Sequence, residues 1–241
     1  MLSGFYSAAT ALERAHQHHE LVAFNLAHAN VPGYRQRIST AATFEAVFQL
    51  LASSQVAERL GVKSAPASID LTPGPLEYTG APLDLAIRGP GFFVVEGPNG
   101  MLYTRVGTLS LNAARELVIP GGYPILGIGG RITIPENVAS VTVLQDGTVF
   151  ANGQPVGQMR LVEVSDARWV EPVGATLFRI PESAIQEARE SSVLQGFRES
   201  SNVNIVAQLV QLIAGFRHFE AAQRALRTLA ESLHWYTRPS G

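Results

Sequence analysis

The chain has 241 residues, enough for one large or two small domains, and it contains no cysteine, which excludes disulfides and thiolate metal sites. Its 18 basic and 20 acidic residues give a formal net charge of −2 without any basic run, which argues against a general nucleic-acid-binding protein. Charged residues make up only 16% of the chain against 46% apolar residues, and this low charge indicates that partners bury much of its surface.

The N-terminal segment, residues 1–34, predicts an amphipathic helix. Its apolar residues recur at alternating spacings of three and four, and only His19 in this row is polar: Phe5, Ala8, Leu12, Ala15, His19, Val22, Leu26 and Ala29. The helix is expected to stop at Asn30-Val31-Pro32-Gly33, because Pro32 disfavours a helical residue before it and Gly33 tolerates a turn. The small residues in the row would allow a second helix to approach closely.

This N-terminus does not have the pattern of a secretory signal peptide. The first basic residue is Arg14, and no compact apolar stretch precedes a cleavage site. Nowhere does an apolar run reach the ~18 residues that a membrane span needs. We therefore expect that a function outside the cytoplasm would require an export route without a cleaved leader.

The middle of the chain changes character at Ile69. Residues 35–68 lack a clean period and predict a linker, which could include a short helix over residues 43–51. From Ile69 to Pro181, β-branched and aromatic runs alternate with turn signals, which indicates an all-β domain, a sandwich or a barrel-like fold. Residues 182–196 predict a polar connector.

Several turns of this β domain can be placed from the sequence. Residues 92–96 and 101–106 are predicted to form a hairpin around Asn99-Gly100. Asp146-Gly147 and Asn152-Gly153 mark two further turns between short apolar runs. Leu177 to Ile180 is expected to be the last strand.

The C-terminal segment, residues 197–241, contains the longest predicted helix, from Ser201 to Trp235, with Asn202 or Ser201 as its N-cap. At ~1.5 Å per residue it would be roughly 50 Å long. Its expected seam consists of Ile205, Leu209, Leu212, Phe216, Phe219, Gln223, Leu226, Ala230 and Leu233, with Val206, Val210 and Ile213 widening the N-terminal end.

Two long apolar seams at opposite ends of one chain predict that the termini pair with each other, with other copies, or both. The fold class is therefore mainly β with long terminal helices, which pair as a coiled-coil-like layer and flank the inserted β domain. The residues expected in the assembly interface are Phe5, Leu12, Val22, Leu26, Ile205, Leu209, Leu212, Phe216, Phe219, Leu226 and Leu233.

A histidine-rich cluster offers the one tempting metal site. It contains Glu13, His16, His18, His19 and Glu20, and spacings of three and four place His16, His19 and Glu20 near one helix face. The order does not match the His-Glu-x-x-His zincin motif. We favour a solvated or interfacial helix face over metal binding.

Other candidate chemistry is weaker. Gly127-Ile128-Gly129-Gly130 could suggest a phosphate loop, but no helical pattern follows it, so turn residues are the better interpretation. Glu77 and Asp84 lie in a β-rich stretch without a candidate nucleophile or base. No catalytic residue, metal site or cofactor is therefore predicted, and the chain is not expected to be an enzyme.

Three ordered motif groups resemble the flagellar basal-body rod and hook family of bacterial axial proteins, over nearly the whole chain. The first group is Tyr6 to Thr10 with Asn25 to Tyr34. The second is Thr72 to Ile87, continued by Gly89 to Phe93 and Tyr103 to Gly107. The third is Gln195 to Phe197, Ser201 to Val206 and Arg217 to Glu220. The matching positions are Asn25, Leu26, Asn30, Gly33, Thr79, Gly80, Leu83, Asp84, Gly91, Phe92, Phe93, Asn202, Val203, Asn204, Arg217 and Glu220. The chain departs from the family pattern at His19, Phe24 and His28.

The resemblance implies a fold and a function. Rod proteins pair their terminal helices into an inner tubular layer and carry the β domain outward. They are carried out by the flagellar type III export apparatus without a cleaved signal. In the periplasm they polymerise with copies of themselves and with other rod and hook axial proteins into the drive shaft between motor and hook. No nucleic acid, membrane span or cofactor is implied.

The resemblance also indicates which members of the family this chain is most similar to. A single small β domain is similar to a rod protein rather than the hook protein. Residues 70–74 and 123–127 resemble the proximal rod member, whereas residues 80–84 and 201–204 resemble the distal one at least as well. The proximal member is slightly favoured.

A second function class stays open at the level of sequence. The β domain could be a binding module or an enzyme whose helices only dimerise. Such a module would not need two long apolar seams at opposite chain ends, and this feature favours the axial subunit.

Overall fold

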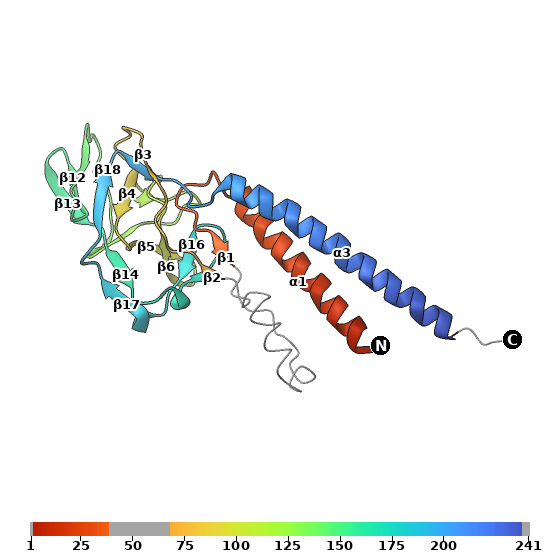
Figure 1. The fold of residues 1–241 in the computed structure, drawn as a ribbon. Coiled ribbons are helices and arrows are strands. Elements are labelled where there is room, and N and C mark those ends of the chain that lie inside the picture. Colours follow the sequence, from red (N-terminus) through yellow and green to blue (C-terminus); the bar gives the residue numbers. More distant parts are fainter. Residues whose placement is uncertain (1, 39–67, 238–241) are drawn as a thin grey trace. The chain divides into compact units, whose positions relative to one another are not determined.

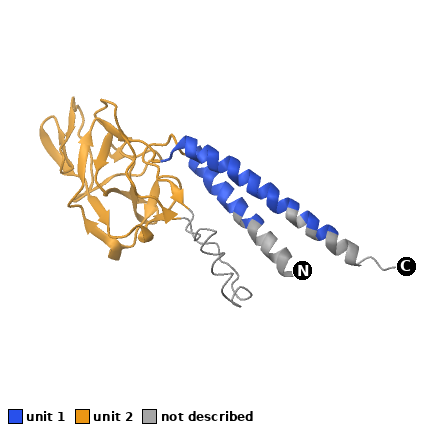
Figure 2. Ribbon diagram, in the orientation of Figure 1, with its two compact units in different colours: residues 1–27, 203–241 blue, residues 28–202 orange. Residues whose placement is uncertain are grey.

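The computed structural model describes residues 2–38 and 68–237, which are mainly β-strands with two long helices (Figure 1). The chain divides into a helical unit, Met1–Ala27 with Val203–Gly241, and a β unit, His28–Asn202 (Figure 2). The helical unit is therefore shorter than predicted, because residues 28–34 and 197–202 belong to the β unit. Within the described ranges, no helix combines the length and apolarity that crossing a membrane requires.

The helical unit consists of α1 (Leu2–Ala27) and α3 (Ile205–Thr237). Helix α1 ends ahead of the predicted stop at Asn30, and a turn follows in which the Val31 amide donates to the His28 carbonyl at 3.0 Å. The N-cap of α3 is Asn204 instead of Ser201 or Asn202, since its side-chain oxygen accepts from the Ala207 amide at 3.0 Å.

The two helices run antiparallel and contact each other (Figure 1). Asn25 Nδ2 lies 3.5 Å from Gln208 Oε1, and both side chains are buried. Further along, the His19 ring packs edge-on against Phe216 with 4.5 Å between ring centroids. A β-carbon on the buried Gly215 would lie 3.8 Å from His18, so this glycine lies at a close approach of the two helices.

The predicted seam of α3 coincides only in part with the side that α1 covers. Leu212 and Phe219 are half-buried, but Ile205, Leu209 and Phe216 are exposed. The reason is that α1 approaches at Gln208 and Gly215, where a polar pair and a missing side chain permit contact. These contacts do not confirm a coiled-coil seam.

The predicted interface residues on α1 also differ in how deeply they are buried. Val22 is fully buried, and Leu12 and Leu26 are half-buried. The side chains of Phe5, Leu226 and Leu233 lie outside the described residues.

The β unit is built around a six-stranded antiparallel sheet with the order β15-β16-β6-β5-β14-β17. Its strands are β5 (Phe92–Gly97), β6 (Gly100–Thr104), β14 (Leu161–Val164), β15 (Glu171–Pro172), β16 (Leu177–Arg179) and β17 (Ile185–Glu187). Two short 3₁₀ helices, η1 (Ala167–Trp169) and η2 (Glu182–Ala184), connect some of them.

Smaller antiparallel ladders surround this sheet. One has three strands, β11 (Val141–Val143), β12 (Thr148–Ala151) and β13 (Gln154–Gln158). The two-stranded ladders are β1 (Arg37–Ile38) with β2 (Ser68–Ile69), β3 (Leu76–Tyr78) with β19 (Phe197–Glu199), β4 (Leu85–Arg88) with β18 (Ser192–Gln195), β7 (Ser110–Leu111) with β8 (Leu117–Val118), and β9 (Leu126–Gly127) with β10 (Gly130–Arg131).

Both faces of the central sheet are covered by apolar clusters. Along β5, Phe93 and Val95 contribute to one cluster, whereas Phe92 and Val94 contribute to the other. All four side chains are buried. Successive side chains of a strand point to opposite faces, so this uninterrupted apolar run is what a strand covered on both sides requires.

The hairpin turns were partly predicted from the sequence. Asn152-Gly153 forms the two-residue loop between β12 and β13, with φ of 49° and 80°, as the sequence predicts. In the β5–β6 hairpin, Gly97 pairs with Gly100, so the loop residues are Pro98-Asn99 and the prediction of Asn99-Gly100 was one residue late.

The predicted connector at residues 182–196 is wrong. This segment contains η2, β17 and β18, of which β17 pairs with β14 and β18 pairs with β4. The expected last strand at residues 177–180 is consequently followed by three more. The ends of the predicted linker form the β1–β2 ladder, while residues 39–67, including the predicted helix at 43–51, lie outside the described residues.

Candidate functional site

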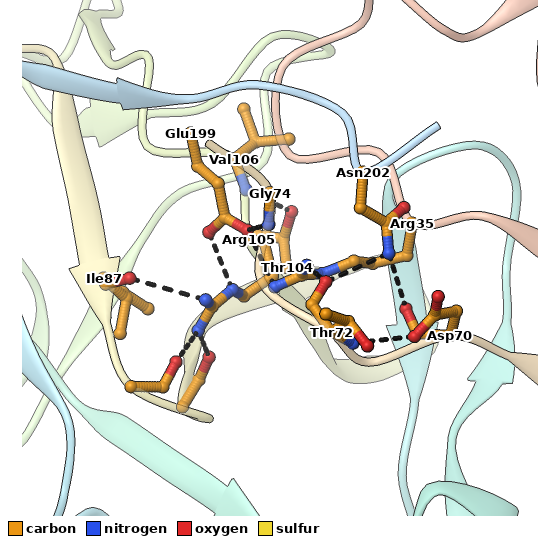
Figure 3. Close-up of polar contacts among 12 residues, drawn as sticks. Arg35, Asp70, Thr72, Gly74, Ile87, Thr104, Arg105, Val106, Glu199 and Asn202 are labelled. Carbon is orange, nitrogen blue, oxygen red and sulfur yellow. Dashed lines mark hydrogen bonds and ion pairs between the residues drawn. The ribbon is translucent and has the colours of Figure 1, made fainter. Parts of the chain in front are cut away.

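Two arginines and one glutamate meet in the interior of the β unit (Figure 3). Arg35 Nη2 lies 2.7 Å from Glu199 Oε1, and Arg105 Nε lies 2.9 Å from Glu199 Oε2. All three side chains are at most 2% exposed. Arg35 precedes β1, Arg105 follows β6 and Glu199 ends β19, so this ion network joins three distant segments of the chain.

The guanidinium of Arg105 is also bonded to backbone carbonyls. Its Nη1 donates to the Gly89 carbonyl at 2.9 Å and to the Gly91 carbonyl, and its Nη2 lies 3.4 Å from the Ile87 carbonyl (Figure 3). Burial lowers the pKa of Arg105, and the Glu199 carboxylate counteracts this. The bonds satisfy most of the donors of a buried cation, as its removal from water demands.

The other half of the network holds the segment before β3. Glu199 Oε1 accepts a hydrogen bond from the Gly74 amide at 3.0 Å, and Arg35 Nη1 donates to the Thr72 carbonyl. Burial lowers the pKa of Arg35 to about 10, while the Glu199 carboxylate raises it. Arg35 therefore keeps its positive charge at neutral pH and remains able to pair with Glu199.

Asn202 connects the same segment to the residue before β1. Its Nδ2 donates to the carbonyls of Asp70 at 3.1 Å and Thr72 at 3.0 Å, and its Oδ1 accepts from the Gln36 amide at 2.7 Å. Both amide hydrogens and the oxygen are thus used. This role explains why Asn202 is not the N-cap of α3.

The C-terminal end of the β unit, residues 189–202, is called the strap below. At its start, Glu163 Oε1 accepts hydrogen bonds from the amides of Arg189 at 3.1 Å and Glu190 at 2.9 Å and from Ser191 Oγ at 2.7 Å. Ser191 Oγ in turn accepts from the Gly91 amide at 2.8 Å. Glu163 on β14 therefore holds the start of the strap.

In the middle of the strap, Gln195 bonds to two other segments. Its Nε2 donates to the carbonyls of Pro82 and Val141, each at 2.8 Å, and its Oε1 accepts from the Val143 amide at 3.1 Å. The strap is thus attached along its length by the side chains of Ser191, Gln195, Glu199 and Asn202.

The contacts of Glu163 lead to a pH prediction. Burial raises the pKa of this carboxyl, but the hydrogen bonds from Ser191, Glu190 and Arg189 outweigh burial and lower it below the ordinary value of 4.5. The folded state then binds this proton less readily than the unfolded state, so the stabilisation is present above about pH 4.5 and is lost as pH falls through the lower folded pKa.

We expect Glu163→Gln to remove this part of the acid sensitivity. Urea midpoints measured from about pH 6 to pH 3 should fall less steeply for the variant than for the natural chain. Glu136→Gln, at an exposed position, is the matched control. Parallel curves for Glu163→Gln and the natural chain would show that the carboxylate does not hold the strap.

A row of apolar side chains on α3 stays largely exposed, and of its members Phe216 also contacts His19 of α1. This apolar stripe consists of Ile205, Val206, Leu209, Val210, Ile213 and Phe216, which are 41–71% exposed. The helix pattern explains the stripe, since spacings of three and four place these residues on one side. Contiguous exposed apolar surface is a mark of interaction sites.

The family-motif positions fall in three structural roles. Gly33 has φ of 68° and donates from its amide to the Glu199 carbonyl at 2.8 Å, and an added β-carbon would lie 2.7 Å from the Val106 amide nitrogen. Residues at strand ends hold the strap through backbone bonds: Thr79, Gly80, Asp84 and Gly91. Apart from Asn202, described above, the others pack in the two units or lie exposed on helices and turns: Asn25, Leu26, Asn30, Leu83, Phe92, Phe93, Val203, Asn204, Arg217 and Glu220.

The histidine cluster is not assembled into a metal site. His16 Nε2 lies 3.3 Å from Glu20 Oε1 on an exposed face, whereas His19 packs on Phe216. In residues 2–38 and 68–237, no three metal-ligating side chains converge.

The roles of the residues that carry the ion network and hold the strap were not predicted from the sequence, and Asn202 was assigned the wrong role. Arg105 and Gln195 lie inside motifs that the resemblance uses, but Arg35, Glu163 and Glu199 carry no local signal. Their partners are distant in sequence. The one hint to the ion network was the low content of charged residues, because a charged residue in a β-rich segment of such a chain is a candidate for a buried ion pair.

Two family descriptions match parts of the chain. The family described as "Flagellar hook protein FlgE/F/G D1 domain" matches residues 86–151, within the β unit. The family described as "Flagellar basal body rod FlgEFG protein C-terminal" matches residues 194–233, which include most of the strap and most of α3.

Similar whole proteins carry rod-protein names. The flagellar basal-body rod protein FlgF of Salmonella typhimurium is 30% identical, with 94% of each chain covered. FlgF of Caulobacter vibrioides is 34% identical over 88% of this chain and 87% of the relative, and the rod protein FlgG of Bacillus subtilis is 27% identical over 97% of each. The chain therefore belongs to the flagellar basal-body rod protein family.

Proposed function

We propose that this rod protein polymerises through its terminal helices, in the periplasm, into the drive shaft that transmits torque from motor to hook. Membership of the rod family supports a structural subunit. The observation that carries polymerisation is the apolar stripe of α3, which α1 leaves largely exposed. The proposal includes no enzymatic activity and no cofactor.

The stripe is large enough to contribute strongly to assembly. Fully burying one large aliphatic or aromatic side chain stabilises by about 1.5–3 kcal/mol, and each of the six residues still has roughly half of its surface to bury. A surface that meets a different surface on the next copy generates an open helical filament. The stripe on one subunit and a second surface on its neighbour would form such a contact.

Torque transmission requires a subunit that does not deform smoothly. The apolar clusters on both faces of the central sheet, together with the ion network, make the β unit densely connected. Packed interiors have low compressibility and transmit strain. These features support a role in which each subunit passes force to the next.

The proposal extends to partners and location. The partners are copies of this chain and other rod and hook axial proteins, together with the flagellar export apparatus that carries the chain out without a cleaved signal. We place it in the proximal rod in preference to the distal rod, on residues 70–74 and 123–127, which resemble the proximal member.

Leu209→Asp tests the role of the stripe. Leu209 is 43% exposed, so the monomer should tolerate Asp, but a neighbouring subunit would bury an unpaired charge. We expect cells with Leu209→Asp in place of the natural chain to lose motility, while the purified variant keeps the thermal unfolding of the β unit.

Gln211→Asp is the matched control, because it places the same charge on an exposed residue of α3 outside the stripe. Cells carrying Gln211→Asp should remain motile. Normal motility of the Leu209→Asp cells would exclude the stripe as an assembly surface.

A further inference from the structure

We propose that docking of the strap, residues 189–202, is the rate-limiting step that completes folding of the β unit. Until the strap docks, the β unit stays open, and Glu199 closes it by pairing with the two interior arginines. This device makes the fold of residues 28–202 depend on their C-terminal end. It concerns one unit of the chain and does not rest on the proposed polymerisation.

The first reason is that the strap supplies partners to strands that lie far away in sequence. Its strand β18 pairs with β4, and its strand β19 pairs with β3, each in a two-stranded ladder. In β4, Leu85, Ala86 and Ile87 are buried. Without β18, backbone groups of these buried residues would lack hydrogen-bond partners, and unpaired buried backbone groups are strongly disfavoured.

The second reason is the charge of the interior. Within the described residues, Glu199 is the carboxylate that forms an ion pair with Arg35 and with Arg105. Both guanidinium groups are almost completely buried. Before the strap docks, they would have to stay hydrated, because a buried charge without its partner is strongly unfavourable. The interior around them can therefore close only when Glu199 arrives.

The third reason is the length of chain that the strap must span. The bond from the Asn202 side chain to the Gln36 amide joins residues 166 apart, and those from Gln195 to Pro82 and from Arg105 to Glu199 span 113 and 94. Closing such loops costs entropy before the contacts stabilise the chain. Long-range pairing of this kind slows folding.

Together these contacts impose an order. A chain synthesised from its N-terminus presents residues 28–188 before the strap. The β4 ladder, the β3 ladder and the ion network would all be incomplete at that point. The β unit would reach its native fold only after residue 202 becomes available.

A disulfide between the strap and β3 tests this order. The chain has no cysteine, so Tyr78→Cys with Phe197→Cys introduces the only pair, at positions that face each other in the β3–β19 ladder. Facing residues of antiparallel strands lie about 4.5–5.5 Å apart between α-carbons, which a disulfide can bridge. The oxidised and reduced forms have one sequence and are compared directly.

We expect the oxidised form to refold from urea at least about 10-fold faster than the reduced form, with little change in its unfolding rate, because the disulfide removes the entropy loss of strap docking. Stopped-flow circular dichroism measures both rates. Equal refolding rates, with slower unfolding of the oxidised form, would place strap docking after the rate-limiting step and overturn the proposal.

Two further disulfides keep the test decisive. Glu77→Cys with Arg198→Cys joins the neighbouring pair of the same ladder and preserves the Tyr78–Phe197 ring contact, so it should accelerate refolding likewise. Thr148→Cys with Gln158→Cys joins β12 to β13, contains no residue of the strap, and should leave the refolding rate unchanged. Equal acceleration by this control would also overturn the proposal.

Discussion

Glu199→Gln is expected to destabilise the β unit by about 3–5 kcal/mol, the usual effect of removing one partner from a buried ion pair. Glutamine has nearly the same shape as glutamate but lacks the charge that Arg35 and Arg105 share. Both cations would then be buried without a carboxylate. Urea unfolding followed by circular dichroism measures the loss, as a lower midpoint at unchanged slope.

Glu77→Gln is the matched control for Glu199→Gln. Glu77 forms an ion pair with Arg198 at 3.0 Å in the β3–β19 ladder, but the side chains of both residues are well exposed. Exposed ion pairs contribute little to stability, so the urea midpoint should stay close to that of the natural chain. A Glu199→Gln midpoint as high as that of the control would mean that the ion network does not hold the β unit together.

Gly107→Ala is expected to be the most damaging of the small substitutions, with a loss of about 3 kcal/mol in the free energy of unfolding. The added β-carbon would lie 1.8 Å from the Leu85 carbonyl oxygen and 2.7 Å from its carbon. The backbone cannot easily move apart, because the Leu85 amide donates to the Gly107 carbonyl at 2.8 Å. The clash is therefore between main-chain atoms of two paired segments.

Gly129→Ala distinguishes this clash from a general effect of replacing glycine. No atom lies within 4 Å of a β-carbon added at Gly129, and its φ is outside the left-handed region. Alanine there should leave stability unchanged or raise it slightly, by restricting the unfolded chain. If Gly107→Ala unfolded at the same urea concentration as Gly129→Ala, the close approach at Gly107 would not exist in solution.

The mainly β middle and the two terminal helices could be predicted from the sequence because their signals are local. The alternation of turn residues with apolar runs indicated the β unit, and the Asn152-Gly153 pair predicted the loop that it forms between β12 and β13. The apolar rows marked α1 and α3. Such features depend on residues a few positions apart, which a single sequence displays.

The position of the α3 stripe relative to α1 was harder to predict. An apolar row indicates that something covers a helix side, but not which partner covers it. Helix α1 approaches α3 where Gly215 lacks a side chain and where Asn25 reaches Gln208, and neither residue stands out by apolarity. The most apolar side of α3 is consequently left exposed.

Residues 189–196 of the strap were predicted to be part of a polar connector, because their pairing partners are distant in sequence. Strand β18 has one deeply buried side chain, Val193, so it lacks the apolar run that marks a strand. Its partner β4 lies about 100 residues earlier, and pairing at that distance has no local signature. The ion network likewise depends on three residues that only the fold brings together.

Electron microscopy of basal bodies tests polymerisation through α3 most directly. Cells lacking this chain would be supplied with the natural protein, with Gln211→Asp or with Leu209→Asp. We expect complete rods and hooks with the natural protein and with Gln211→Asp, and missing or truncated rods without hooks with Leu209→Asp or with no protein. Complete hook-basal bodies in the Leu209→Asp cells would contradict assembly through the apolar stripe.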